Sequence, residues 1–401
     1  MHLNRRDLCR AALAVAAAPA LLDIRTSNAG QQMVAARRIA TAQSSLAMRL
    51  LGAIAGTRSA ANIVISPASL AGTLSTIERG GTFRLARALH RLLGFDRRAS
   101  AWSDFNTLRR ATNTPNGNNG PLTSANALFI DSAVAPFERA IHNLAAHGIK
   151  IDVSDFGKPE SLAAINTWVN DRTKGKIPNM LDALAHDTAL IAVNALHFKD
   201  HWLIRFDADE TRPALFHLAG GETIDLPLMH TGSTRLRFRQ DERFIAVELP
   251  YATLGYSMVI VTTRETPEPA RAFTGLADWL GGTGFAEYAG EVTLPRFGVK
   301  SSMDLMPALS ALGLRPPNSL PGFAKGPLRL AKAQQHVVVN VDEEGTEAAA
   351  ATAVLATRSF DGGYVKAIVD KPFLFALRDS TTGLIVIAGY IGKPEAGTDP
   401  A

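Results

Sequence analysis

The feature that most constrains this chain is a strand that runs into a long tract of small residues. Residues 336–341 are rich in valine, which fits a buried, pleated surface. After an acidic turn come the alanines of residues 348–351, which favour a helix but carry too little apolar surface to bury one of its faces. Residues 361–363, Asp-Gly-Gly, suit no periodic element. The tract therefore predicts a mobile loop that is able to become a strand and that exposes a cleavable Arg358–Ser359 bond.

Composition indicates a soluble globular protein. Of the 401 residues, 46% are apolar and 20% are charged. Outside the N-terminal segment there is no apolar run of the roughly 20 residues that span a bilayer. The formal net charge is +5, and removal of residues 1–29 leaves 38 basic and 35 acidic residues, or +3. This excess is too small to indicate a nucleic-acid partner.

Residues 1–29 resemble a twin-arginine export signal. Arg5 and Arg6 precede an alanine-rich apolar stretch over residues 11–22, and small residues offer cleavage after Ala20 or Ala29. We therefore expect a periplasmic or extracellular protein. Cys9, the only cysteine, would leave with the signal, so the mature chain would have no disulfide.

Many short strands mixed with helices predict an α+β fold with antiparallel sheets. The central strand is expected at residues 190–198, which are apolar on both faces and so are covered from both sides. Further strands are expected at residues 62–65, 123–130, 247–251, 256–261 and 292–297, with a C-terminal hairpin over 371–378 and 384–392. Helices are expected at residues 31–56, 66–80, 81–94, 165–175 and 304–313, and a surface loop at 112–121.

The acidic turn and the small residues after it resemble the hinge of the serpins, inhibitors of serine proteases that are consumed by their target. The resemblance rests on Glu343, Glu344, Gly345, Thr346, Glu347, Ala348, Ala349, Ala350, Ala351 and Thr352. The resemblance covers about residues 35 to 395, with its segments in the same order as in the family. The sequence shows no internal repeat. The resemblance implies a single serpin-like domain over 30–395, with a large central antiparallel or mixed sheet, smaller sheets and about eight or nine helices. An exposed reactive-centre loop would cover about 343–363, and residues 396–401 would form a disordered tail.

The same resemblance implies residues that control the opening of the central sheet. Ser66 and Ser69 look like the "shutter" serines, with Asn194 at the shutter position and Trp202 near the "breach" where the loop enters. Ser66 also reads as the cap of a helix that begins at Pro67, and Asn194 as a satisfied core amide. Where relatives often carry a histidine, this chain has Gln335, with His336 next to it. Either the shutter bond is made differently, or the alignment shifts by one residue.

The resemblance implies a single unfinished turnover. A protease cleaves the loop, and the loop inserts as an extra strand while the acyl-enzyme is still attached. Alternation along a strand directs Thr346, Ala348, Ala350, Thr352 and Val354 into the sheet, and all of them are small or medium-sized. Arg358 before the cut suits a trypsin-like protease. The spacing from Glu343 places Ser359 there instead, with cleavage before Phe360 by an elastase-like or subtilisin-like protease, and both readings stay open.

No nucleophile–base set, metal motif or phosphate loop is present in the sequence, so we expect neither an enzyme nor a metal or other cofactor. Arg84, Arg87 and Arg91 share one helical face, which some serpins use for acidic polysaccharides, although such faces are more often only solvated. The expected partner is a target protease held in a covalent complex, and the expected state is a monomer. A non-inhibitory serpin that binds or carries a ligand is the alternative, and a secreted hydrolase is the more distant one.

Overall fold

The computed structural model describes residues 5–57, 61–95, 103–104, 106, 121–145, 150–173, 175, 177–185, 188–315, 318–346 and 363–395. The expected surface loop at 112–120, the tail at 396–401 and the loop residues 347–362 lie outside these ranges. The alternative reactive bonds at Arg358, Ser359 and Phe360 therefore stay predictions, as do the hinge positions from Glu347 to Thr352.

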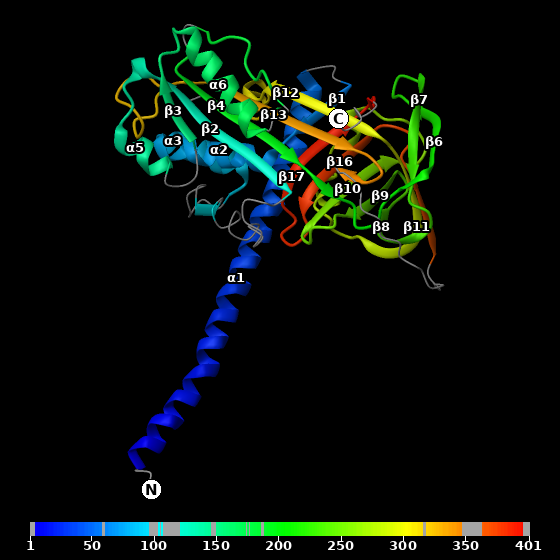
Figure 1. Ribbon diagram of the computed structural model, residues 1–401, viewed down its shortest axis with the longest axis horizontal. Helices are drawn as coiled ribbons and strands as arrows, with labels where there is room; N and C mark the ends of the chain where they lie inside the picture. Colours follow the sequence, from blue (N-terminus) through cyan, green and yellow to red (C-terminus); the bar gives the residue numbers. More distant parts are fainter. Residues whose placement is uncertain are drawn as a thin grey trace.

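Most of the described helices lie at one end of the molecule (Figure 1). The described residues contain seven α-helices where the sequence predicts about eight or nine. They are α1 (Arg5–Thr57), α2 (Pro67–Gly80), α3 (Phe83–Leu93), α5 (Glu138–Ala145), α6 (Pro159–Arg172), α7 (Ala277–Leu280) and α8 (Met306–Ala311), with 3-10 helices at Ser132–Val134 and Ala270–Phe273.

The ends of the helices follow local sequence signals. Ser66 caps α2 by accepting a hydrogen bond from the Ser69 amide, and Pro67 occupies its first turn. Gly94 ends α3 in the left-handed conformation, with φ of 67°. Helix α1 begins at Arg5, well before the expected residue 31, and its first part projects away from the body of the protein (Figure 1). Within the described residues, no helix is long and apolar enough to cross a membrane.

The site of interest belongs to a seven-stranded sheet in the order β3-β2-β4-β13-β14-β5, with β12 paired to β13. Strands β4 and β13 are parallel neighbours, whereas β2 with β4 and β12 with β13 are antiparallel. The bounds are β2 (Leu122–Asp131), β3 (Lys150–Ser154), β4 (Leu190–Phe198), β5 (Asp200–His201), β12 (Phe297–Asp304), β13 (Leu330–Val341) and β14 (Gly345–Thr346).

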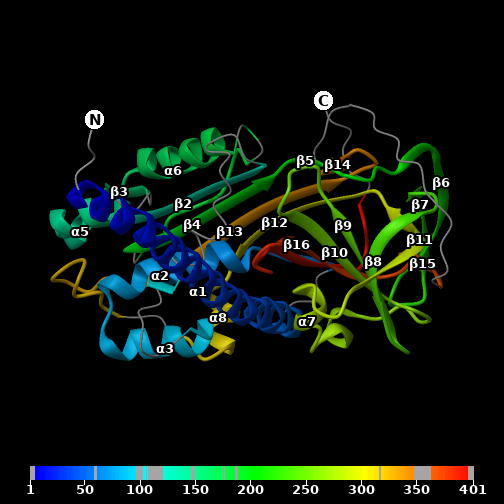
Figure 2. The same cartoon turned by 90° about the horizontal axis from the view of Figure 1, so that it is seen from below.

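A ten-stranded curved sheet lies beside the first sheet, in the order β1-β17-β16-β10-β9-β8-β11-β7-β6, with β15 paired to β11 (Figure 2). The expected pair at 247–261 and the C-terminal hairpin are both found in it. Its strands are β1 (Asn62–Ile65), β6 (Asp207–His217), β7 (Thr223–His230), β8 (Thr234–Gln240), β9 (Phe244–Pro250), β10 (Tyr256–Thr263), β11 (Ala286–Pro295), β15 (Tyr364–Ile368), β16 (Phe373–Asp379) and β17 (Ile385–Ile391).

Strand β4 is covered on both faces, as its apolar sequence predicts. Every one of its residues is buried. Ile191, Val193 and Ala195 pack in a cluster with Ile165 and Val169 of α6. The alternate residues pack on the other side, where Leu196 joins the core shared with the ten-stranded sheet. The junction between β4 and β13 thus lies in the middle of the molecule, and a strand that entered there would be buried on both sides.

Candidate functional site

The hinge begins as a short strand at one end of the junction between β4 and β13. We call this junction the seam: residues 190–197 of β4 pair directly with residues 330–338 of β13. Beyond the seam, Thr346 of β14 pairs with Val341 of β13 on one side and with Asp200 of β5 on the other. Both pairings are antiparallel. Thr346, from which insertion is expected to begin, therefore already lies between β13 and β5, while the seam itself is closed.

A tight turn reverses the chain before β14. The Asp342 carboxylate accepts hydrogen bonds from the amides of Glu344 and Gly345 at 2.9 and 3.0 Å, and the Asp342 amide donates to the Gly345 carbonyl at 3.1 Å. An aspartate that satisfies the amides two and three residues later is typical of such turns. Burial raises the pKa of Asp342, although these two amides lower it.

Three successive hinge carbonyls are bound by the segment after β5. The Trp202 indole N–H donates to the Asp342 carbonyl at 3.0 Å, and the Trp202 amide donates to the Glu344 carbonyl at 2.9 Å. The Phe206 amide donates to the Glu343 carbonyl at 3.1 Å. Trp202 thus lies beside the turn that precedes β14, and it holds the backbone of the hinge directly.

Gly345 and Thr346 fit closely into this site. A Cβ at position 345 would lie 2.1 Å from the Asp200 carbonyl oxygen, so only glycine is accommodated without movement. Thr346 is 1% exposed, and its hydroxyl lies 2.6 Å from the Tyr251 hydroxyl. The Tyr251 ring stacks on Trp202 at 4.4 Å between centroids, and burial raises the pKa of the Tyr251 phenol well above its usual value.

Charged partners fix the two hinge glutamates. The Arg296 Nε donates to both carboxylate oxygens of Glu343, at 2.7 and 2.8 Å, and the Thr211 hydroxyl donates to one of them. Glu343 is only 6% exposed, and the low dielectric constant around its carboxylate strengthens the attraction to Arg296. Glu344 pairs with Arg205 at 3.1 Å and is more exposed. We call residues 342–346 together with Trp202, Tyr251 and Arg296 the hinge contact.

A second group of polar residues joins the two strands within the seam. Gln335 of β13 donates to Asn194 Oδ1 of β4 and to the Ser66 carbonyl, each at 3.0 Å, while the Ser66 amide donates to Gln335 Oε1 at 2.7 Å. Asn194 also donates to the Thr73 hydroxyl at 3.0 Å and to Asn126. The Ser66 hydroxyl donates to the Val386 carbonyl at 2.7 Å. We call Ser66, Asn194 and Gln335, with their neighbours Thr73 and Asn126, the central polar cluster.

The geometry separates the two alternatives at positions 335 and 336. Gln335, not His336, bonds to Asn194 and Ser66, because neighbouring residues of a strand point to opposite faces. Ser69 contributes its carbonyl to Asn194 at 3.5 Å rather than its hydroxyl. His336 Nδ1 is buried without a hydrogen-bond partner, and burial first and Lys300 second lower the pKa of this imidazole.

Arg84, Arg87 and Arg91 all lie exposed along α3, as their spacing predicts. Arg87 lies over the ring of Phe83 at 5.9 Å. Among the described residues, no group of three or more His, Cys, Asp or Glu side chains is placed to hold a metal ion.

Sequence reasoning missed Arg296, Arg205 and Tyr251, which contact the hinge from distant parts of the chain. Tyr251 follows directly after the Val247–Pro250 stretch, and Arg296 lies between Pro295 and Phe297 at the end of an expected strand. No local pattern marks either residue as a hinge partner. The only signal was indirect: two successive acids in a buried turn require cationic partners somewhere in the fold.

Comparison with known proteins agrees with this geometry. A family model described as "Serpin (serine protease inhibitor)" matches residues 41–394. A serine protease inhibitor of Cyanea capillata is 26% identical over 89% of this chain and 99% of the relative. A serpin-like protein of Thermococcus kodakarensis is 30% identical over 84% and 82%, and human antithrombin-III is 29% identical over 83% and 76%.

Solved structures show the same fold. Native protease nexin-1 with heparin has a TM-score of 0.77 at 24% identity, with 90% of this chain and all of that chain covered. Human thyroxine-binding globulin in complex with thyroxine has a TM-score of 0.79 at 21% identity, with 90% and 99% covered. The chain belongs to the serpin family. The fold and the family expected from the sequence are therefore confirmed.

Proposed function

We propose that this protein inhibits a serine protease by serving as a substrate whose turnover is never completed. The observation that carries the proposal is the position of Gly345 and Thr346. They pair with β13 and with β5 directly beyond the end of the seam, where β4 and β13 no longer pair with each other. A segment that is only connecting two elements has no need of a glycine that close to Asp200, nor of a buried threonine bonded to Tyr251.

The proposed reaction begins as ordinary proteolysis. The protease serine attacks the carbonyl carbon of the residue before the cut, the peptide bond breaks, and the new amine leaves with a proton from the protease histidine. The ester that remains joins protease and inhibitor. Cleavage frees the residues after Thr346 to enter the seam, and each new backbone hydrogen bond contributes roughly 1 kcal/mol.

The proposed target is a trypsin-like protease that accepts Arg358 in an acidic pocket. Cleavage between Ser359 and Phe360 by an elastase-like or subtilisin-like protease is the alternative. We also propose that residues 1–29 direct export to the periplasm or beyond. The mass of the mature chain would then correspond to a start at residue 21 or 30.

The direct test is to mix the mature protein with trypsin, chymotrypsin and elastase and to look for a complex that survives SDS. Mass spectrometry of the released C-terminal peptide identifies the bond. We expect a complex with trypsin and a peptide that begins at Ser359. Clean loop cleavage by every protease, without a complex, would reject inhibition and leave a binding or carrier role.

A matched pair of variants tests the role of the hinge. Thr346→Arg places a charge where Thr346 is buried, so insertion is obstructed and the variant is expected to be cut as a simple substrate. Thr346→Ser keeps a small side chain and the hydroxyl that faces Tyr251, and is expected to keep most of the trapping. Equal loss of trapping in the two variants would contradict obstruction of insertion by a buried charge.

A further inference from the structure

An exposed patch lies on the outer face of β11 and β15, directly where the chain returns after the reactive loop. Tyr364 and Ile368 of β15 are 48% and 46% exposed, which is unusual for large apolar side chains on a strand. The alternate residues of β15, Val365 and Ala367, are buried. Strand β15 therefore presents one apolar face to the core and a second, partly apolar face to solvent.

The side chains on this face are held in place. The Tyr364 hydroxyl donates to one carboxylate oxygen of Glu291 at 3.1 Å, and Lys366 Nζ lies 2.7 Å from the other. Lys366 Nζ is 5.9 Å from the centre of the Tyr364 ring. The lysine lowers the pKa of Glu291, and the glutamate raises the pKa of Lys366, so both stay charged at neutral pH. The patch consists of Tyr364, Lys366, Ile368 and Glu291.

The backbone below the patch is also fixed. Strand β15 pairs with β11 from Tyr364 to Ile368, and a Cβ at Gly290 would lie 2.2 Å from the Val365 carbonyl oxygen. The Val369 amide donates to the Thr293 carbonyl at 2.8 Å. A tyrosine held in one orientation on a fixed strand loses little conformational entropy when a partner covers it.

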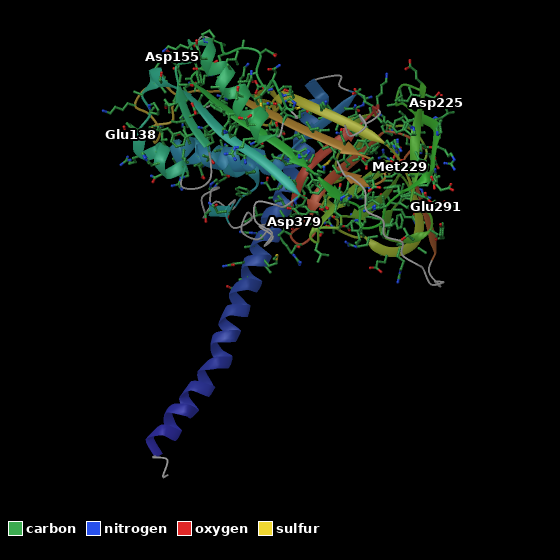
Figure 3. All side chains as sticks on the ribbon, in the orientation of Figure 1. Glu138, Asp155, Asp225, Met229, Glu291 and Asp379 are labelled. Atoms are coloured by element: carbon green, nitrogen blue, oxygen red, sulfur yellow. The ribbon has the colours of Figure 1, made fainter. Side chains whose placement is uncertain are left out.

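The position of the patch identifies what would cover it. Tyr364 is six residues after Arg358, so the two are at most about 20 Å apart along an extended chain. A protease domain of about 220 residues has a radius of gyration of about 17 Å. A protease that holds the reactive bond is therefore within reach of this end of the molecule, where Figure 3 shows Glu291 far from Glu138 and Asp155.

We propose that Tyr364 and Ile368 form a secondary recognition site for the body of the target protease. This inference rests on the proposed inhibitory function. The contacted surface lies on the side of the protease that binds residues after the cut, and it would offer an apolar recess for the Tyr364 ring and Ile368. Because Glu291 and Lys366 neutralise each other, the contact would depend little on salt. The patch sets how fast the protease is captured, and the hinge sets whether it is trapped.

The test compares Tyr364→Ala and Ile368→Ser with Phe83→Ala. Phe83 is a 77% exposed aromatic residue on α3, at the opposite end of the molecule (Figure 2). With trypsin, chymotrypsin and elastase as probes, we measure the second-order rate of complex formation and the number of inhibitor molecules consumed per trapped protease. We expect a rate about tenfold lower for Tyr364→Ala, a smaller loss for Ile368→Ser, and no change for Phe83→Ala. The number consumed should stay constant in all three.

Equal rates for the two patch variants and Phe83→Ala, with every protease that the unaltered protein traps, would overturn the proposal and leave the inhibitory function standing. If the unaltered protein traps none of the three, the inhibitory function fails, and the rate of loop cleavage then provides the same comparison. Tyr364→Phe, which keeps the ring, is expected to stay within about twofold of the unaltered protein. Should Tyr364→Ala not fold, Ile368→Ser still decides the question, because its side chain is exposed at the other end of the patch.

Discussion

The hinge contact and the central polar cluster both join the two sides of the seam, but they do so with different chemistry. The hinge contact uses ions and aromatic rings: the Arg296–Glu343 pair, and Trp202 stacked on Tyr251. The central polar cluster uses neutral amides and hydroxyls, with Gln335 bonded to Asn194 and Ser66. The comparison predicts that stability at the entrance to the seam depends on salt concentration, whereas stability in its middle depends on hydrogen-bond geometry.

This difference follows from burial. The Arg296 side chain is 37% exposed, so its guanidinium keeps part of its hydration and a charge at the entrance has only a small desolvation penalty. Asn194 and Gln335 are 5% and 2% exposed, where an unpaired charge would be very costly. A neutral amide satisfies both its donors and its acceptor without that cost, which is why the middle of the seam is held without charge.

Asn194→Leu should have the largest effect on this comparison. The substitution keeps a branched side chain but removes the amide, and it leaves Gln335, Thr73 and Asn126 each short of a partner. We expect a loss of about 3 kcal/mol in the free energy of unfolding. Urea unfolding measures it, and Asn318→Leu, at an exposed position, is the control. A loss no greater than that of the control would mean that the central polar cluster does not hold the seam.

Gly345→Ala should rank second. The added Cβ collides with the Asp200 carbonyl, so β14 must leave its place between β13 and β5. We expect a loss of about 2 kcal/mol and faster proteolysis of the hinge. Gly326→Ala is the control, since a Cβ there meets nothing within 4 Å. Unchanged proteolysis of the hinge would contradict the proposed fit of β14.

Glu343→Gln should cost less, about 1 kcal/mol, because Arg296 is partly solvated and is left with a neutral partner. The informative measurement is the dependence on salt. Between 0.05 and about 1 M NaCl, the unaltered protein should lose stability and the variant should lose less. Glu287→Gln, in the exposed pair with Arg235 at 3.7 Å, is expected to change neither value. Parallel salt curves for the unaltered protein and Glu343→Gln would show that the entrance does not depend on charge.

The smallest effect concerns pH and His336. Burial lowers the pKa of His336 in the folded protein, so the unfolded chain, with a pKa of about 6.5, takes up the proton first. Stability contributed by the neutral imidazole is therefore present above pH 6.5 and is lost as the pH falls below it. His336→Phe should lose less stability between pH 7.5 and 5.5, with a difference of about 2 °C or less in the unfolding midpoint. A slope identical to that of the unaltered protein would exclude His336 as the source.

How far the sequence led depends on the length and periodicity of each element. Strand β4 was predicted with its observed bounds because seven apolar residues in a run of nine leave few other interpretations. Strand β14 was not predicted as an element, because two residues carry no periodicity. The hinge was found through its small residues, yet its ionic partner Arg296 lies 47 positions earlier, and only the fold brings them together.

The choice between Gln335 and His336 shows the limit most clearly. The two residues are adjacent, and exchanging them would direct the other residue towards Asn194. The choice depends on the register of β13 against β4, where Gln335 lies opposite Asn194. That register is set by pairings along the whole strand, and no short motif contains it.

The parallel arrangement of β4 and β13 has a consequence for how this sheet can grow. A chain that turns back after β13 runs antiparallel to both of its neighbours, as β14 already does. Each residue that entered the seam after β14 would therefore replace one parallel pairing between β4 and β13, with its slanted hydrogen bonds, by two antiparallel pairings with straighter hydrogen bonds. If the proposed insertion occurs, the sheet gains its new strand in its interior and not at a free edge, where strands of other chains could also pair.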